Sequence, residues 1–248
     1  MLRRAARHLV PTKIARRTSS RKLAAGRSEF GNLSMAQSFE RVYAQRLWGG
    51  EGQPSSGSGS AEVLAAPYAK MVHAVIESEK ARSVADLGCG DFSVGRLIAC
   101  DGIEYIGVDI VDSIIQRNRA SHSSAHVRFV RRDLATEDPP LADVGLLRQV
   151  LQHLSNDEIL AVLSRCTRYE LILVTEHIPQ GRGWVPNLNK PHGPDIRLFD
   201  GSGVMLEAPP FSLPVRELQT LPHGGNLGGC LRTVALRGQD VEEHLVTA

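Results

Sequence analysis

The stretch that most constrains the fold is VADLGCGDFSVG, residues 84–95, in which an apolar run leads through two glycines into a more polar segment. This is the pattern of a buried strand, a tight turn and the start of a helix. Gly88 and Gly90 carry no side chain that would hold the backbone away from a ligand. Ligands of open α/β sheets bind beyond the carboxyl ends of the strands, so this turn predicts a ligand site.

The rest of the chain alternates between strand and helix patterns. We predict strands at residues 83–87, 105–110, 127–133, 143–147 and 170–176, and helices at 61–80, 93–100, 112–120 and 156–166. Residues 179–214, rich in Pro, Gly and Asn, are expected to form long loops, and two late strands at 214–221 and 230–237 are expected to form a hairpin. The pattern predicts an α/β class fold: a Rossmann-like, doubly wound, mostly parallel sheet with helices on both faces.

Acidic residues follow three of these strands. Asp86 precedes the glycine turn and could accept a hydrogen bond from a ligand's ammonium group, and Asp109 ends the next strand, where a carboxylate can hold both hydroxyls of a ribose. Asp133 follows the third strand. A dinucleotide-binding fingerprint would need a third glycine at position 93, where this chain has Ser93.

Taken together, Asp86-x-Gly88-x-Gly90, Asp109, Asp133 and the late hairpin resemble the class I S-adenosylmethionine-dependent methyltransferases over residues 61–237. The resemblance implies a seven-stranded sheet whose last strand is antiparallel. It also implies cofactor-binding roles. Asp86, Gly88 and Gly90 would surround the methionine moiety and Asp109 the ribose, while the remaining members of the cofactor set would be Ile110, Asp133, Leu134 and Gln149.

A second resemblance concerns the molecule that would accept the methyl group. WGGEGQPSSGSGS, the ADLGCGDFS turn and APPFSLP resemble a bacterial subgroup of these enzymes linked to glycan modification, which implies a saccharide or other small-molecule hydroxyl as acceptor. APPF differs from the Asn/Asp-Pro-Pro-aromatic tetrad of nucleic-acid base N-methyltransferases, since Ala208 opens it and it follows the fifth strand. An enzyme acting on RNA or protein, and a cofactor-binding protein without turnover, remain alternatives.

His153 stands in QVLQHLSNDE, between the fourth strand and the next helix. By placement alone it is either a structural histidine or a base beside the acceptor. QVLQHLSNDEILAVLSRC resembles the segment of small-molecule O-methyltransferases in which a histidine, followed shortly by Asp-Glu, is the base. This resemblance favours His153 as the general base, and His177, after the fifth strand, is the second catalytic candidate.

Other side chains could serve a metal or the acceptor. Glu176, His177 and Asp195 could bind a divalent cation such as Mg²⁺, although their loose spacing favours ordinary surface-loop residues. Trp48, Trp184, Phe199 and Phe211 are candidates for the acceptor pocket, since aromatic faces suit sugars, but loop aromatics more often anchor a loop to the core.

Charged residues are distributed unevenly along the chain. Residues 1–27 hold nine of the 29 Lys and Arg residues and no acid, so the remainder has 20 basic against 27 acidic residues. An acidic body argues against a nucleic-acid partner. We therefore predict a basic N-terminal arm (1–47), a Gly/Ser-rich loop or lid (48–60) and a methyltransferase domain (61–248).

The arm could be a mitochondrial-type presequence, could lie on anionic lipid, or could pack on the domain or on a second subunit as a homodimer contact, which is the reading we favour. No apolar run reaches membrane-spanning length. The four scattered cysteines form no CxxC pair and suit a reducing compartment. We therefore expect a cytoplasmic protein, or a mitochondrial one if the arm is a presequence.

Overall fold

The computed structural model describes residues 29–49, 55–223 and 228–247. Residues 1–27, with their nine Lys and Arg residues, lie outside these ranges. No helix of the described part is long and apolar enough to cross a membrane.

A single sheet of seven strands, in the order β3-β2-β1-β4-β5-β7-β6, forms the frame of the structure. Its strands are β1 (Ser83–Leu87), β2 (Glu104–Asp109), β3 (Val127–Arg131), β4 (Val144–Arg148), β5 (Leu171–Ile178), β6 (Arg216–Pro222) and β7 (Cys230–Arg237). β1 to β5 are parallel, and β7 lies between β5 and β6, antiparallel to both. The predicted α/β fold with an antiparallel last strand is therefore confirmed.

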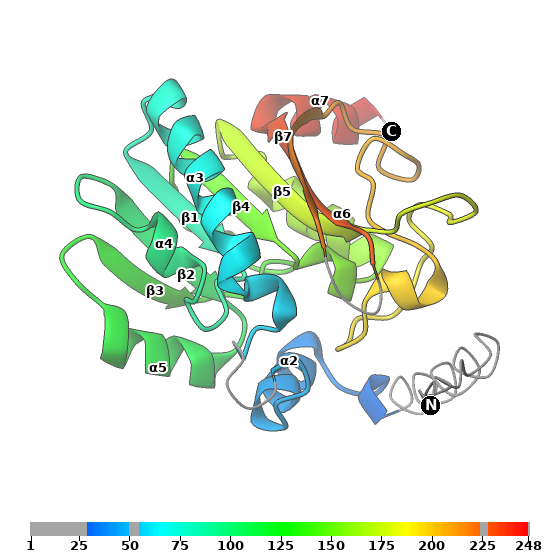
Figure 1. The fold of residues 1–248 in the computed structure, drawn as a ribbon, viewed down its shortest axis with the longest axis horizontal. Helices are drawn as coiled ribbons and strands as arrows, with labels where there is room; N and C mark the ends of the chain where they lie inside the picture. The colour runs from blue at the N-terminus through cyan, green and yellow to red at the C-terminus, as the bar shows by residue number, and fades with distance from the viewer. Residues whose placement is uncertain (1–28, 50–54, 224–227, 248) are drawn as a thin grey trace, which may run out of the picture.

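Helices cover both faces of this sheet (Figure 1). The helices of the described structure are α2 (Met35–Ala44), α3 (Glu62–Glu79), α4 (Gly95–Ile98), α5 (Asp112–His122), α6 (Asn156–Cys166) and α7 (Gly238–Thr247). Short 3-10 turns are η1 (Ser58–Ser60), η2 (Leu151–His153) and η3 (Arg197–Asp200). α6 begins at Ser155, which forms a capping box with Glu158, and it buries Ile159, Val162, Leu163 and Cys166 at helical spacing.

Successive residues of each central strand fall in two different apolar clusters. Leu171 and Leu173 pack with α3 residues, whereas Ile172 and Val174 pack with α6 residues. This alternation is the period of a strand, and it shows that both faces of the sheet are buried.

The helix predicted at 93–100 is wrong in extent, since α4 covers only residues 95–98. α4 starts later than predicted because Oδ1 of Asp91 accepts the backbone N–H of Ser93 at 3.1 Å and holds this segment in a turn. Phe92, with φ +63°, cannot belong to a right-handed helix.

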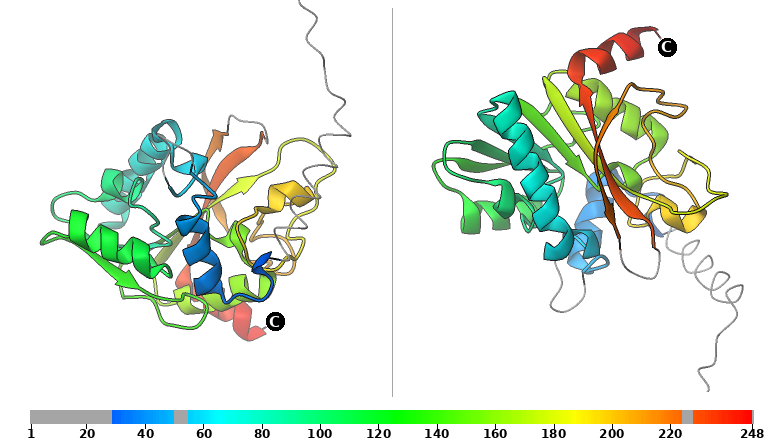
Figure 2. Two further views of the ribbon diagram at one scale, coloured as in Figure 1. Left: turned by 90° about the horizontal axis from the view of Figure 1, so that it is seen from below. Right: turned by 45° about the horizontal axis from the view of Figure 1, so that its top comes forward.

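α2 lies below the sheet in Figure 1, and the left view of Figure 2 shows it across the middle of this end of the molecule. Ser34 and Gln37 form its capping box, and it buries Phe39 and Val42 in the same cluster as residues of α6. The part of the predicted arm that the structure describes thus packs against the rest of the fold.

Candidate active site

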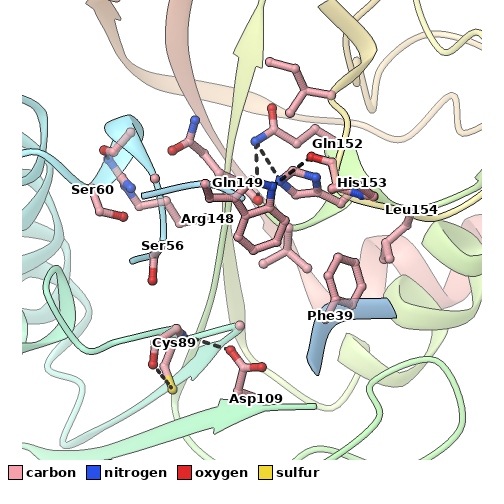
Figure 3. Close-up of a pocket in the computed structure, with 18 of the residues that line it drawn as sticks. Phe39, Ser56, Ser60, Cys89, Asp109, Arg148, Gln149, Gln152, His153 and Leu154 are labelled. Atoms are coloured by element: carbon pink, nitrogen blue, oxygen red, sulfur yellow. Dashed lines mark hydrogen bonds between the residues drawn. The ribbon is translucent and has the colours of Figure 1, made fainter. Parts of the chain in front are cut away.

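A cavity of about 370 Å³ opens at the carboxyl ends of β1, β2, β4 and β5. Its walls come from the turns after these strands, from α2 and Trp48, from the Ser56–Ser60 segment and from the loop around Pro194. Figure 3 shows Cys89 and Asp109 on one side of the space, with Arg148, Gln149 and His153 across from them. The cavity therefore lies where the sheet topology predicts a ligand.

The glycine turn after β1 forms the floor of one end. Gly88 has φ +94°, and a Cβ there would lie 2.3 Å from Cγ2 of Val150. Gly90 donates its N–H to Oδ2 of Asp109 at 3.0 Å. Both predicted glycines line the cavity, and at position 88 only glycine fits without moving its neighbour.

Asp86 and Asp109 both line the cavity and are buried. Asp109 also accepts the N–H of Val111, on Oδ1, at 3.0 Å, so each of its oxygens holds one backbone donor and keeps a further lone pair. Asp86 accepts the hydroxyl of Tyr105. Burial raises the pKa of Asp86 to about 6. A cation bound beside Asp86 would favour its ionised form.

Three other members of the predicted cofactor set, Ile110, Leu134 and Gln149, also line the cavity. Asp133 is absent from the lining described; its Oδ1 instead accepts the N–H of Ala135 at 3.0 Å. That bond shapes the turn that brings Leu134 to the wall.

His153 is buried in the cavity wall, with 8% of its surface exposed. Its ring lies 4.6 Å from the ring of Trp48, and its Nε2 lies 3.4 Å from the side-chain nitrogen of Gln152. The same Gln152 nitrogen faces the carbonyl of Gln149, so it acts as a donor and leaves the lone pair of His153 on Nε2. Burial lowers the pKa of His153 to about 3, which keeps the ring neutral.

Glu176 fixes the backbone that carries His153. Its two carboxylate oxygens accept the N–H groups of Leu151 at 2.8 Å and Gln152 at 3.1 Å, at the start of η2. Burial raises the pKa of Glu176 to about 8. Glu176 is absent from the cavity lining described, so it supports η2 from behind.

The predicted metal set is not brought together. Glu176 and His177 are neighbours on β5, so their side chains leave opposite faces of the sheet. Asp195 forms an ion pair with the buried Lys190 at 3.2 Å. Within residues 29–49, 55–223 and 228–247, no three His, Cys, Asp or Glu side chains are placed to hold a metal ion.

Of the predicted acceptor aromatics, Trp48 and Phe199 line the cavity, and Nε1 of Trp48 donates to the carbonyl of Pro194 at 2.8 Å. Phe211 is 1% exposed and packs in the core, while Trp184 is absent from the described lining. The Phe and Tyr rings that join them there are Phe39 and Tyr43 of α2 and Tyr68 of α3. The capping box at Ser34-Gln37 was the sequence signal that could have located α2.

Sequence reasoning also missed polar lining residues. Tyr43 and Ser56 share a hydrogen bond of 3.2 Å, and Ser56 accepts the N–H of Asp91 at 3.0 Å, which ties α2 and the serine segment to the glycine turn. Arg148, which ends β4, and His223, which follows β6, line the same cavity. An arginine at the carboxyl end of a parallel strand was the available signal for Arg148.

A family model described as a methyltransferase domain matches residues 84–169, which run from β1 past α6. The matched segment contains the glycine turn, Asp109 and His153. The chain is an S-adenosylmethionine-dependent methyltransferase. No curated protein sequence matches it.

Solved structures share the fold of this methyltransferase. The N-methyltransferase NodS from Bradyrhizobium japonicum WM9, in complex with S-adenosyl-L-homocysteine, has a TM-score of 0.56 at 11% identity, over 81% of this chain and 97% of that one. The methyltransferase domain of bacterial CtHen1-C has a TM-score of 0.51 at 18% identity, over 68% and 96%. The N-terminal domain of EvdMO1 with SAH bound has a TM-score of 0.50 at 17% identity, over 80% and 95%. At these identities the likeness establishes the fold.

The residues of the cavity fit the cofactor. Asp86 offers a carboxylate for an ammonium group and Asp109 one for a ribose, while Ile110 and Leu134 give apolar walls for a base. Gly88 lets the turn pack against Val150, whose Cγ2 would lie only 2.3 Å from a Cβ at position 88.

Proposed function

We propose that this methyltransferase methylates a hydroxyl oxygen of a small molecule, including saccharides, and that His153 is the general base. The observation that carries the proposal is the buried, neutral imidazole of His153, whose Nε2 lone pair lies at the cavity wall opposite the glycine turn. A hydroxyl is a weak nucleophile while it keeps its proton, so a positioned acceptor for that proton is useful.

When bound, the cofactor supplies an electrophilic methyl group on a positively charged sulfur. Nε2 of His153, which accepts a 3.4 Å hydrogen bond from Gln152, would exchange this donor for the acceptor hydroxyl and take its proton as the oxygen is methylated. Because methyl transfer would remove the cofactor's positive charge, a proton on the imidazole would leave the net charge of the buried site unchanged. This balance would allow His153, whose pKa burial lowers to about 3, to accept the proton.

Surrounding residues hold the base in place. Trp48 packs on one face of the imidazole and Glu176 fixes the turn beneath it. Phe39, whose ring lies 6.2 Å from that of His153, helps to exclude water. Such pre-positioning keeps the distance between base and acceptor hydroxyl short during attack.

The test is S-adenosylhomocysteine release from a panel of saccharides and phenols by the wild type, His153→Ala and His153→Gln. We expect both variants to lose about 10²–10⁴-fold in kcat, the usual contribution of a general base. Cofactor affinity, measured by calorimetry, should stay within about threefold of the wild type. This change is far smaller than the loss of one hydrogen bond to a charged group would cause.

His73→Asn is the matched control. His73 bonds the carbonyl of Leu97 at 3.0 Å and is absent from the cavity lining described, so this variant should keep its kcat. Turnover by His153→Ala at the wild-type rate would return His153 to a structural role.

A further inference from the structure

Three basic side chains from distant parts of the sequence form one wall of the cavity: Arg148, His177 and His223, hereafter the basic wall. Arg148 pairs with Thr175 across β4 and β5, so the two side chains share a face of the sheet. His177 lies two residues beyond Thr175 on β5 and therefore shares that face too. His223 follows β6 and completes the group.

Contacts hold the basic wall together. The rings of His177 and His223 lie 4.3 Å apart, and His177 donates from Nε2 to the carbonyl of Gly228 at 2.7 Å. Arg148 donates from Nη2 to the carbonyl of Gly59 at 2.8 Å, and its guanidinium lies 4.9 Å from the ring centre of Tyr68. The ring contact between the two histidines and the effect of the Arg148 charge on His223 show that the three groups lie near one another in the cavity lining.

The carboxylates near the basic wall have other partners in the described structure; Asp86 shares the face of Arg148, because it pairs with Leu146 two residues before Arg148 on β4. The carboxylates near Arg148 are Asp86 and Glu176. Asp86 is bonded by Tyr105 and belongs to the cofactor end, and Glu176 leaves the opposite face of the sheet, where it accepts two backbone N–H groups. Burial lowers the pKa of His177 to about 4, and burial together with nearby Arg148 lowers the pKa of His223.

The wall also differs from what a neutral sugar needs. Sugar hydroxyls call for hydrogen-bond acceptors as well as donors. Among the described lining residues the carboxylates are Asp86 and Asp109, and both lie at the cofactor end. Near His177 and His223 the charged group offered is the Arg148 guanidinium, a donor whose planar geometry matches a carboxylate or a phosphate.

We propose that the basic wall binds an anionic group of the acceptor, a carboxylate in the first instance, and so selects acidic hydroxylated acceptors over neutral ones. This inference rests on the proposed function and names its substrate class. Arg148 supplies the charge, and the anion would draw the histidines towards their protonated, donating forms.

Matched acceptor pairs test the idea: catechol against 3,4-dihydroxybenzoate, and glucose against glucuronate, with S-adenosylhomocysteine release as the readout. We expect the acidic member of at least one pair to have a kcat/KM about 10- to 100-fold higher, the range for a hydrogen bond to a charged group. Arg148→Gln should abolish this ratio, Arg148→Lys should keep part of it, and His223→Gln should reduce it. Equal kcat/KM values within both pairs for the wild type would overturn the proposal.

The control variant is Arg128→Gln, because Arg128 is half-exposed and pairs with Glu104 on the surface at 2.9 Å. It should keep the wild-type ratio. Thermal melting of each variant checks that Arg148→Gln is folded, and Arg148→Lys keeps the test usable if it is not.

Two binding measurements distinguish an anion on the acceptor from the cofactor's own carboxylate. They also distinguish a failure of the basic-wall proposal from a failure of the proposal that His153 is the base. If Arg148→Gln loses S-adenosylhomocysteine affinity while the acidic-to-neutral ratio persists, the wall holds the cofactor's own carboxylate and the proposal is overturned. Equilibrium binding of 3,4-dihydroxybenzoate and catechol to cofactor-loaded His153→Ala requires no turnover. A preference for the acid there supports the basic wall even if His153 proves not to be the base, and equal affinities there count against it.

Discussion

The two ends of the cavity are built in different ways. The end that we propose for the cofactor, called the cofactor end, takes Asp86, Gly88, Gly90 and Asp109 from two adjacent strands and the turns that follow them. The acceptor end takes Phe39 from α2, Trp48, His153 from η2 and Phe199 from η3, which are far apart in the chain. A site made from one local motif can be recognised from its residue spacing, whereas a site assembled from distant segments cannot.

The largest effect should follow from filling the cofactor end. Gly88→Ala places a Cβ 2.3 Å from Val150 at φ +94°. We expect S-adenosylhomocysteine affinity to fall about 100-fold, because the turn must shift to relieve both the contact and the backbone strain. Calorimetry measures it.

Gly102→Ala is the matched control for Gly88→Ala. Gly102 has φ +84°, but a Cβ there meets nothing within 4 Å. This variant should lose about 1–2 kcal/mol of stability from the backbone strain alone and keep its cofactor affinity. Equal losses of cofactor affinity in the two variants would mean that backbone strain, and not the contact with Val150, explains the effect of Gly88→Ala.

A change at the acceptor end should leave the cofactor end intact. Trp48→Ala removes the ring beside His153 and the bond to Pro194. We expect kcat/KM to fall about 30-fold, since small displacements of a catalytic group are costly, while cofactor affinity changes little. A fall in S-adenosylhomocysteine affinity of the same size would show that the two ends are not separable.

The pH dependence of binding sharpens the role of Asp86. Its pKa of about 6 lies above the ordinary value, so the carboxylate is protonated below pH 6 and ionised above it. A cofactor ammonium prefers the ionised form, so affinity should weaken as pH falls through 6, by about tenfold per pH unit. Asp86→Asn should bind the cofactor more weakly at pH 8 and show a pH-independent affinity between pH 5 and 8. If the substitution leaves the pH dependence unchanged, the titrating group is not Asp86.

The smallest effect should come from the contact that links the two ends. Tyr43→Phe keeps the ring beside Trp48 but removes the hydroxyl that bonds Ser56. One neutral hydrogen bond contributes about 1 kcal/mol, so we expect cofactor affinity to fall about three- to fivefold. No change in either cofactor affinity or kcat/KM would show that α2 serves the acceptor end through its apolar side chains alone.

Most of the cofactor end was predictable because its signals are local. Strand β1 and the glycines after it are adjacent in sequence, and Ile110 and Leu134 follow the ends of the next two strands. The predictions for Trp184 and Phe211 rested on residue type in a loop, and residue type does not tell whether a ring faces the cavity or the core. Phe211 is in the core and Phe199 is in the wall.

By itself, the sequence determined the succession of strands and helices of a mostly parallel sheet with a late antiparallel hairpin, and the glycine turn with its two carboxylates, because hydrophobic period and turn chemistry are properties of neighbouring residues. Only the tertiary structure decided which face each side chain occupies and what it meets there. It separated Glu176 from His177 across the sheet, set Trp48 against His153, and brought Arg148, His177 and His223 to one wall. The physical reason is that contacts between distant segments depend on how whole elements pack, which residue spacing along one segment does not record.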